Sequence, residues 1–188
     1  MAQLVGLQAP NASVGEFNGD YYAAVEAVPK AERNILPWLK SPDRIENQSE
    51  LFEVIAIDTW LVNDDRNMGN VIGTPLGDGR IKVFMIDFEK SRALGPNPFT
   101  SSSVDPKYLR PTAELGAILS QIRPPRIPNG LLNRIAVISE EELRNTIFPV
   151  AAELPFVNWH DSSAELLHKR AGNIANLVEE VWSAWKTN

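Results

Sequence analysis

Apolar and polar positions change period along the 188-residue chain, and these changes predict its elements. Two short apolar runs flank Asn18-Gly19-Asp20. Asn-Gly favours a tight hairpin turn because both central residues tolerate positive φ. We therefore predict a β-hairpin over residues 11–28, which Pro29 ends. Residues 29–48 are polar and contain several prolines, a composition typical of a linker or of short helical turns.

The middle of the chain predicts a helix followed by a second, smaller hairpin. Apolar residues recur at helical spacing over 49–62, and Asn47 or Ser49 is placed to cap that helix. A polar cluster at 63–67 follows, and then Val71-Ile72 and the run 81–86 predict two strands joined by a glycine-rich turn. The second strand has apolar residues on both of its faces, so we expect both faces to be buried.

The last third of the chain predicts helices. Residues 90–111 form a long irregular loop in this interpretation, and everything after 112 is helical. Ser139 followed by Glu142 is a capping box that opens one helix. Apolar residues then step by three and four along one stretch, which predicts a single long helix over 163–186. The residues of two predicted helical stripes are Leu115, Ile118, Leu119 and Ile122, and then Leu167, Ala171, Ile174, Val178, Val181 and Trp185.

Composition and charge exclude several classes of function. The chain has no cysteine, which excludes disulfides, thiolate zinc sites, iron–sulfur clusters and a cysteine nucleophile. Its formal net charge is −6 and it has no basic run, which argues against nucleic acid or an anionic membrane as the main partner. No apolar run is long enough to span a bilayer, and the first residues lack a signal-peptide pattern. We therefore expect a cytoplasmic protein.

The residues that favour a specific chemistry lie between 58 and 88. Phosphoryl transfer needs a carboxylate that orients or deprotonates the acceptor hydroxyl, and hard oxygen ligands for magnesium. Asp65 is followed five positions later by Asn70, and Asp87 ends the second predicted strand. The small hairpin would bring Asn70 and Asp87 to the same end of its two strands. This arrangement is typical of a kinase catalytic loop and metal site.

The stretch Asn63-Asp64-Asp65-Arg66-Asn67-Met68-Gly69-Asn70 with Ile86-Asp87-Phe88 resembles the HipA-like serine/threonine kinases, and more distantly the catalytic loop of phosphoinositide kinases. The resemblance implies an α+β, mostly helical, protein-kinase-like fold. It implies Asp65 as the catalytic base, and Asn70 and Asp87 as ligands of Mg²⁺ and ATP. It also implies that Asn63, Arg66 and Asp58 position the loop. The acceptor would be a Ser or Thr hydroxyl of a protein substrate.

The chain also departs from that family pattern. Asn67 stands where these families often have His, and Glu89 stands where many protein kinases have Gly. No glycine-rich phosphate loop is present, and nothing supplies the lysine that grips the phosphates. The resemblance therefore implies a partial N-lobe over 1–28, with the hinge near Val28-Pro29, and a helical C-lobe over 29–188. A separate chain, or a second copy pairing through 11–28, would complete the ATP site.

Other interpretations remain open at this point. A catalytically inactive kinase remnant that acts as a protein-binding inhibitor or interaction module fits the missing phosphate-gripping half. A small-molecule phosphotransferase of the aminoglycoside-kinase type shares the Asp-to-Asn spacing. Asn63 and Arg66 also suit an ordinary polar turn. His160 and His168 lie eight positions apart with no cysteine, which favours surface or capping roles over a metal site.

Overall fold

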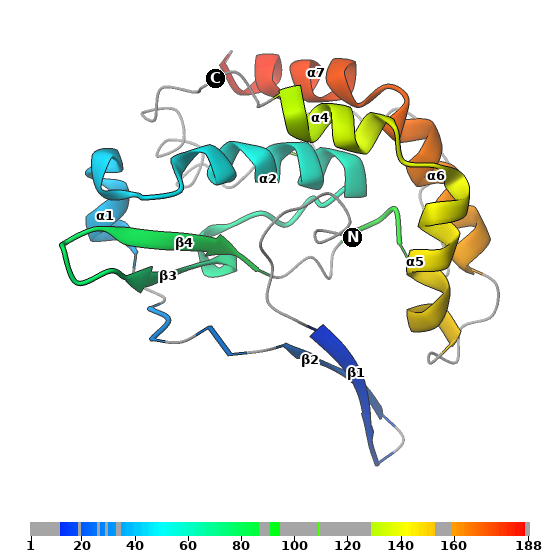
Figure 1. Ribbon diagram of the computed structural model, residues 1–188, viewed down its shortest axis with the longest axis horizontal. Helices are drawn as coiled ribbons and strands as arrows, with labels where there is room; N and C mark the ends of the chain where they lie inside the picture. The colour runs from blue at the N-terminus through cyan, green and yellow to red at the C-terminus, as the bar shows by residue number, and fades with distance from the viewer. Residues whose placement is uncertain are drawn as a thin grey trace.

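The chain is α+β and mostly helical in the part that the structure describes, with two separate antiparallel hairpins (Figure 1). The computed structural model describes residues 12–18, 20–25, 27–28, 30–32, 35–86, 91–94, 109, 129–152 and 159–186. The predictions for residues 1–10, for most of the loop 90–111 and for the stripe 115–122 lie outside these ranges. The division into an N-lobe and a C-lobe stays a prediction.

The described elements follow the chain in a simple order. Their bounds are β1 Ala12–Phe17, β2 Asp20–Val25, α1 Leu36–Leu39, the 3-10 turn η2 Pro42–Arg44, α2 Gln48–Leu61, the 3-10 turn η3 Met68–Asn70, β3 Val71–Pro75, β4 Ile81–Met85, α4 Asn129–Ala136, α5 Glu140–Ala152, α6 Trp159–Ala171 and α7 Ile174–Lys186. The polar, proline-containing stretch before α2 therefore forms short helical turns, as its composition indicates.

The first predicted hairpin is confirmed. Strands β1 and β2 pair in antiparallel register from Ala12↔Val25 to Phe17↔Asp20. Asn18, in the turn, has a φ of 55°, a left-handed conformation that asparagine tolerates better than most residues. Among the described strands, β1 and β2 pair only with each other.

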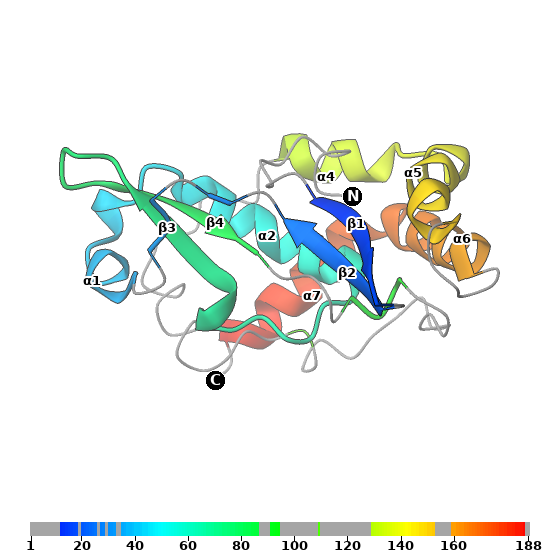
Figure 2. The ribbon, with the colours of Figure 1, turned by 90° about the horizontal axis from the view of Figure 1, so that it is seen from below.

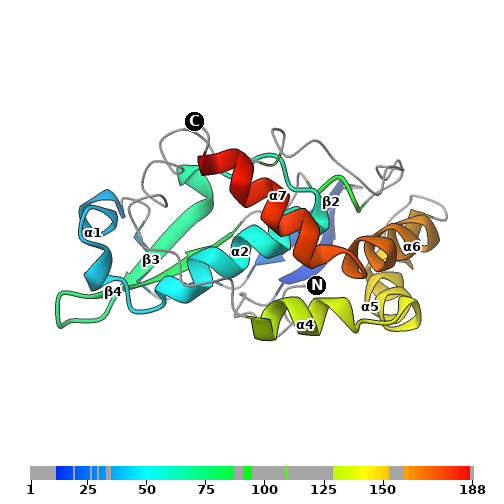
Figure 3. The same ribbon diagram turned by 90° about the horizontal axis from the view of Figure 1, so that it is seen from above.

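Helix α2 forms the centre of the structure and confirms the predicted helix. Every residue from Val54 to Val62 is buried, so the helix has no solvent face over its second half. Helices α4, α6 and α7 and strand β4 pack against it. Viewed from above, α7 crosses over α2 (Figure 3), and both hairpins lie on the opposite side of α2 (Figure 2). The apolar residues of this half point in every direction and require this covering, and Asp58 and Thr59 are buried among them.

The second hairpin is also confirmed, with one correction. Strands β3 and β4 pair from Val71↔Met85 to Pro75↔Ile81. The prediction that both faces of β4 are buried was wrong. Ile81 and Val83 are buried, whereas Lys82 and Phe84 on the other face are partly exposed. The Lys82 ammonium lies 5.7 Å from the centre of the Phe84 ring, a cation–π contact at the edge of solvent. One face of β4 therefore packs toward α2 while the other meets solvent in part.

Asn47 does not cap α2 with its side chain, which corrects the sequence prediction. It occupies the N-cap position, but its carboxamide faces β4 instead. Its Nδ2 donates to the Val83 carbonyl at 2.7 Å, and its Oδ1 accepts from the Val83 amide at 2.9 Å. The Glu46 amide donates to the Ile81 carbonyl at 2.9 Å. The side chain thus acts as one more peptide group along the edge of β4.

The C-terminal helices differ from the prediction of one long helix over 163–186. A turn at Gly172 and Asn173 divides this stretch into α6 and α7. The apolar stripe is nevertheless buried on both sides of the turn, from Leu167 and Ala171 to Val181. The step of three and four residues continues across the turn, so periodicity alone could not reveal the break.

The capping box that opens α5 is confirmed. The Ser139 Oγ accepts from the Glu142 amide at 3.1 Å, and the Glu142 Oε2 accepts from the Ser139 amide at 2.9 Å. Each side chain thus satisfies a backbone donor that the helix itself cannot pair. Across the described residues, no helix is both long and apolar enough to cross a membrane.

Replacing Asn47 by Asp should destabilise the protein. The carboxylate would keep the bond from the Val83 amide but would face the Val83 carbonyl without a proton to donate, in a buried position. We expect a loss of about 1–3 kcal/mol in the free energy of unfolding, measured by urea denaturation. Asn176→Asp, the same change on the exposed face of α7, is the control and should stay within about 0.5 kcal/mol. Equal stabilities for the two variants would contradict the role of Asn47.

Acid should weaken α5 through Glu142. Hydrogen bonds from the Ser139 amide and hydroxyl lower the pKa of Glu142 below its ordinary value. Folding therefore favours the charged form of Glu142, whose contribution is present above the ordinary pKa and is lost as the pH falls below that value and through the lowered pKa. The gap in urea midpoint between wild type and Glu142→Gln should shrink from pH 7 to pH 3. Glu141→Gln is the matched control, and a gap for Glu142→Gln that does not depend on pH would contradict this role.

Candidate functional site

The predicted catalytic loop begins where α2 ends in a strained residue. Val62 has φ 57° and ψ 48°, the left-handed region, where a β-branched residue is a genuine outlier. The amides of Val62 and Asn63 both turn back to the Asp58 carbonyl, the latter at 2.8 Å. Strain of this kind costs about 1–3 kcal/mol and persists only where the surroundings hold it in place. The chain therefore leaves the helix in one fixed direction.

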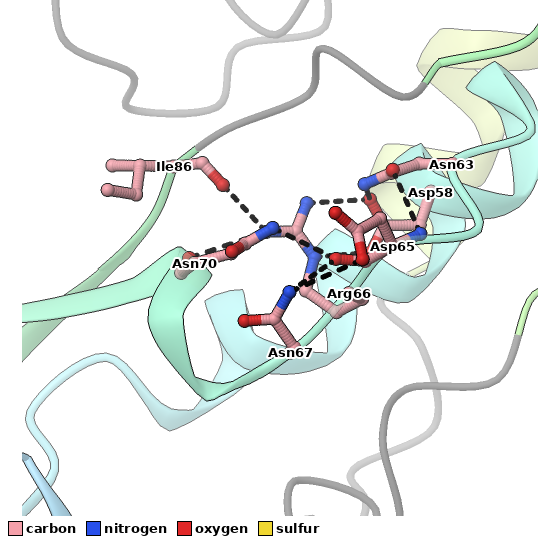
Figure 4. Close-up of polar contacts among 7 residues, drawn as sticks. All are labelled: Asp58, Asn63, Asp65, Arg66, Asn67, Asn70 and Ile86. Atoms are coloured by element: carbon pink, nitrogen blue, oxygen red, sulfur yellow. Dashed lines mark hydrogen bonds and ion pairs between the residues drawn. The ribbon is translucent and has the colours of Figure 1, made fainter.

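An ion pair between Arg66 and Asp58 joins the loop to α2 (Figure 4). Arg66 Nε lies 2.8 Å from Asp58 Oδ2, and Nη2 lies 2.8 Å from Oδ1. The Arg66 and Asp58 side chains are only 4% and 7% exposed. Two parallel bonds between a guanidinium and a carboxylate fix both distance and orientation. Arg66 therefore holds the loop against the buried face of the helix.

The same guanidinium also reaches the end of the β3–β4 hairpin. Arg66 Nη1 donates to the Ile86 carbonyl at 2.8 Å and lies 3.4 Å from the Asn70 carbonyl. The Ile86 amide donates to the Asn70 carbonyl at 2.9 Å. One buried side chain thus ties together the helix, the loop and the residue that follows β4.

Side-chain amides hold the backbone of Asp65 from several directions (Figure 4). The Asn70 and Asn67 Nδ2 groups donate to the Asp65 carbonyl at 2.9 and 3.0 Å. Asn67 Nδ2 also lies 3.5 Å from Asp65 Oδ1, and Asn67 Oδ1 accepts from the Gly69 amide at 2.8 Å. Asn63 donates to Asp58 Oδ1 at 2.8 Å. The Asp65 residue itself is exposed, so a fixed backbone presents its carboxylate to solvent.

The chain returns to the end of α2 at residues 91–94. Ser91 forms a backbone bridge with Asn63, and the Arg92 and Ala93 amides donate to the Val62 and Leu61 carbonyls at 3.2 and 3.1 Å. The Arg92 side chain pairs with Asp64, with Nη2 2.6 Å from Oδ2. The segment that contains Asp87 therefore begins at Ile86 beside Asn70 and ends at Ser91 beside Asn63.

Arg170, for which no sequence pattern indicated a role, satisfies two further carbonyls of α2. Its Nε donates to the Trp60 carbonyl at 3.0 Å, and its Nη2 donates to the Thr59 carbonyl. The Trp60 indole donates back to the Leu167 carbonyl at 2.9 Å. Burial lowers the pKa of Arg170 to about 10, which leaves it charged at neutral pH. A cation at the carbonyl end of a helix is also favoured by the helix dipole.

The structure brings together five of the residues singled out from the sequence: Asp58, Asn63, Asp65, Arg66 and Asn70. Asp87 and Glu89 lie outside the described residues, as does the His160 side chain. His168 lies away from the loop, with Nδ1 3.1 Å from the Ile138 carbonyl. Within the described ranges, no group of three or more His, Cys, Asp or Glu side chains forms a metal site.

Comparisons of the chain with models of protein families, with curated proteins and with solved structures each found no match. The chemistry of the site therefore rests on the geometry of the loop. That geometry gives an exposed carboxylate on a fixed backbone, with a carboxamide held beside it. Asn70 donates through Nδ2 to the Asp65 carbonyl, an orientation that leaves its Oδ1 as an acceptor atom.

Breaking the Asp58–Arg66 ion pair should destabilise the fold far more than breaking an exposed one. Asp58→Asn leaves the Arg66 guanidinium buried without a counter-charge, and we expect a loss of about 3–5 kcal/mol in unfolding free energy. The matched control is Asp78→Asn, because Asp78 Oδ2 lies 2.7 Å from Arg80 Nε while both side chains are 50% exposed. That change should cost about 1 kcal/mol or less. Similar losses in urea denaturation would show that Asp58 and Arg66 do not hold the loop.

Proposed function

We propose that this chain is a HipA-like kinase that transfers the γ-phosphoryl group of ATP to a Ser or Thr hydroxyl. The observation that carries the proposal is the fixed loop: Asp65 exposes its carboxylate while its own carbonyl binds the Asn70 carboxamide. Kinase catalytic loops use an Asp and an Asn at this spacing for the acceptor hydroxyl and for the metal. The α+β, mostly helical architecture is compatible with a kinase C-lobe.

Asp65 is the proposed catalytic base. Two carboxamides hold its backbone carbonyl. The orientation of the carboxylate therefore does not depend on an ion pair. Asn67 Nδ2, 3.5 Å from Asp65 Oδ1, orients the carboxylate from the position where related families carry His. The carboxylate would accept the proton of the acceptor hydroxyl as the oxygen attacks the phosphorus. A base of this kind works through position as much as through basicity.

Asn70 and Asp87 are the proposed ligands of Mg²⁺ and, through it, of ATP. Both offer hard oxygen atoms, the donors that Mg²⁺ prefers. Ile86, the residue before Asp87, bonds to Asn70, and Ser91, four residues after Asp87, bridges to Asn63. The segment carrying Asp87 is thus anchored at both ends to the loop that carries Asn70. In this proposal MgATP provides the phosphoryl group, and the protein holds that group opposite the Asp65 carboxylate.

A protein-binding module is the second candidate function, and one observation favours it. Strands β1 and β2 pair only with each other among the described strands, and a lone two-stranded hairpin is marginal in water. Strand edges that no other described strand covers are templates for pairing with a further strand. In this second proposal the kinase fold is inactive, and the hairpin binds a protein partner through a strand edge.

Thermal unfolding with MgATP separates the two candidates. At about 100 times its dissociation constant, a ligand stabilises by about 2.7 kcal/mol, or about 5–10 °C for a domain of this size. We expect this shift for the wild type and its loss in Asp87→Ala. Asp65→Ala should keep the shift but lower the rate of phosphoryl transfer by about 10²- to 10⁴-fold.

Asp78→Ala, which removes an exposed carboxylate at the β3–β4 turn, is the control and should match the wild type in both assays. Transfer from labelled ATP should be followed with protein Ser/Thr acceptors and, in parallel, with small hydroxyl compounds. Absence of any MgATP shift in the wild type would contradict the kinase proposal and favour the binding module.

A further inference from the structure

Two carboxylates stand side by side in the loop, and the structure treats them differently. Asp64 Oδ2 lies 2.6 Å from Arg92 Nη2, and its side chain is only 20% exposed. Asp65, the next residue, is exposed and forms no ion pair with a described cation. The Arg92 side chain is 56% exposed, so this ion pair adds little stability but directs the Asp64 carboxylate toward residue 92. Of the two adjacent carboxylates, Asp64 thus pairs with Arg92 and Asp65 faces solvent.

The Arg92–Asp64 ion pair also sits within a set of backbone bonds. The Arg92 amide donates to the Val62 carbonyl at 3.2 Å, the Ala93 amide donates to the Leu61 carbonyl at 3.1 Å, and Ser91 bridges to Asn63. The side-chain pair thus closes a short ladder between residues 61–64 and 91–93. Strained Val62 lies inside this ladder, where it depends on its neighbours to stay in the left-handed region.

We propose that Arg92 is a positioning residue for Asp65, acting through Asp64. It holds the Asp64 carboxylate away from the acceptor side, fixes the backbone between Asn63 and Asp65, and so aims the Asp65 carboxylate. This inference rests on the proposed kinase function for its catalytic part. Its structural part concerns only the ladder between residues 61–64 and 91–93. Arg92 does not contact substrate in this scheme.

The chain offers a matched control in the Arg80–Asp78 ion pair. That pair has the same residue types, a distance of 2.7 Å and half-exposed side chains. It joins residues two apart within one turn, so its loss releases no other segment. Arg80→Ala should therefore reproduce the loss of an exposed ion pair without the loss of the ladder.

The first measurement is amide hydrogen exchange in the full chain. Arg92→Ala and Asp64→Asn should each raise the exchange rates of the Asn63, Arg92 and Ala93 amides about tenfold, with an unchanged global unfolding midpoint. The double variant should exchange no faster than either single variant, because both changes remove the same bond. Arg80→Ala should leave these amides unchanged. Unaltered exchange in both single variants would overturn the inference.

The second measurement is steady-state phosphoryl transfer. Arg92→Ala should lower kcat about tenfold and leave the KM for MgATP unchanged, since Asp65 is not a nucleotide ligand, and Arg92→Lys should recover part of the loss. A faster-exchanging ladder with an unchanged kcat would overturn the positioning role. No transfer by the wild type would instead overturn the proposed kinase function, and with it the catalytic part of the inference, while hydrogen exchange still decides the structural part.

Discussion

The C-terminal end of α2 imposes the main physical constraint on this structure. A helix leaves its last four carbonyl groups without partners, and here that end is buried. Buried carbonyls must be paired, and here backbone amides and one arginine side chain pair them. The donors are the Val62 and Asn63 amides for Asp58, Arg170 for Thr59 and Trp60, the Ala93 amide for Leu61 and the Arg92 amide for Val62.

The candidate site is built on that solution. The donors come from the loop that follows α2, from the segment after β4 and from α6, so satisfying the helix brings these three parts to one place. The spacing of Asp65 and Asn70 predicted that they act together, and the structure confirms that they touch. For Asp58 and Arg66, only the family resemblance indicated a role in positioning the loop, and their ion pair was not predicted. No sequence pattern indicated the roles of Arg92 and Arg170, because their partners are backbone carbonyls or a carboxylate that is distant along the chain.

The elements that the sequence predicted well are those set by near neighbours. The capping box of Ser139 and Glu142 needs only residues three apart, and the Asn18 turn needs only its own backbone preference. Asn47 was misjudged because local rules make it a helix cap, whereas its partner Val83 lies 36 residues away. The break at Gly172 was missed because the apolar stripe continues through it; glycine after a possible helix end was the available signal. A tertiary contact thus decided the error at Asn47, whereas the break at Gly172 had a local signal.

The distance along the chain between Trp60 and Arg170 affects how the protein matures on the ribosome. The two residues are 110 positions apart. At about 5–20 residues per second, Arg170 is synthesised about 5–20 s after the helix whose carbonyls it pairs. Throughout that interval the apolar sides of α2 lack α4, α6 and α7, and the end of the helix lacks its buried cation. The loop can therefore reach its final geometry only after Arg170 has been synthesised, and until then the nascent chain exposes the apolar sides of α2.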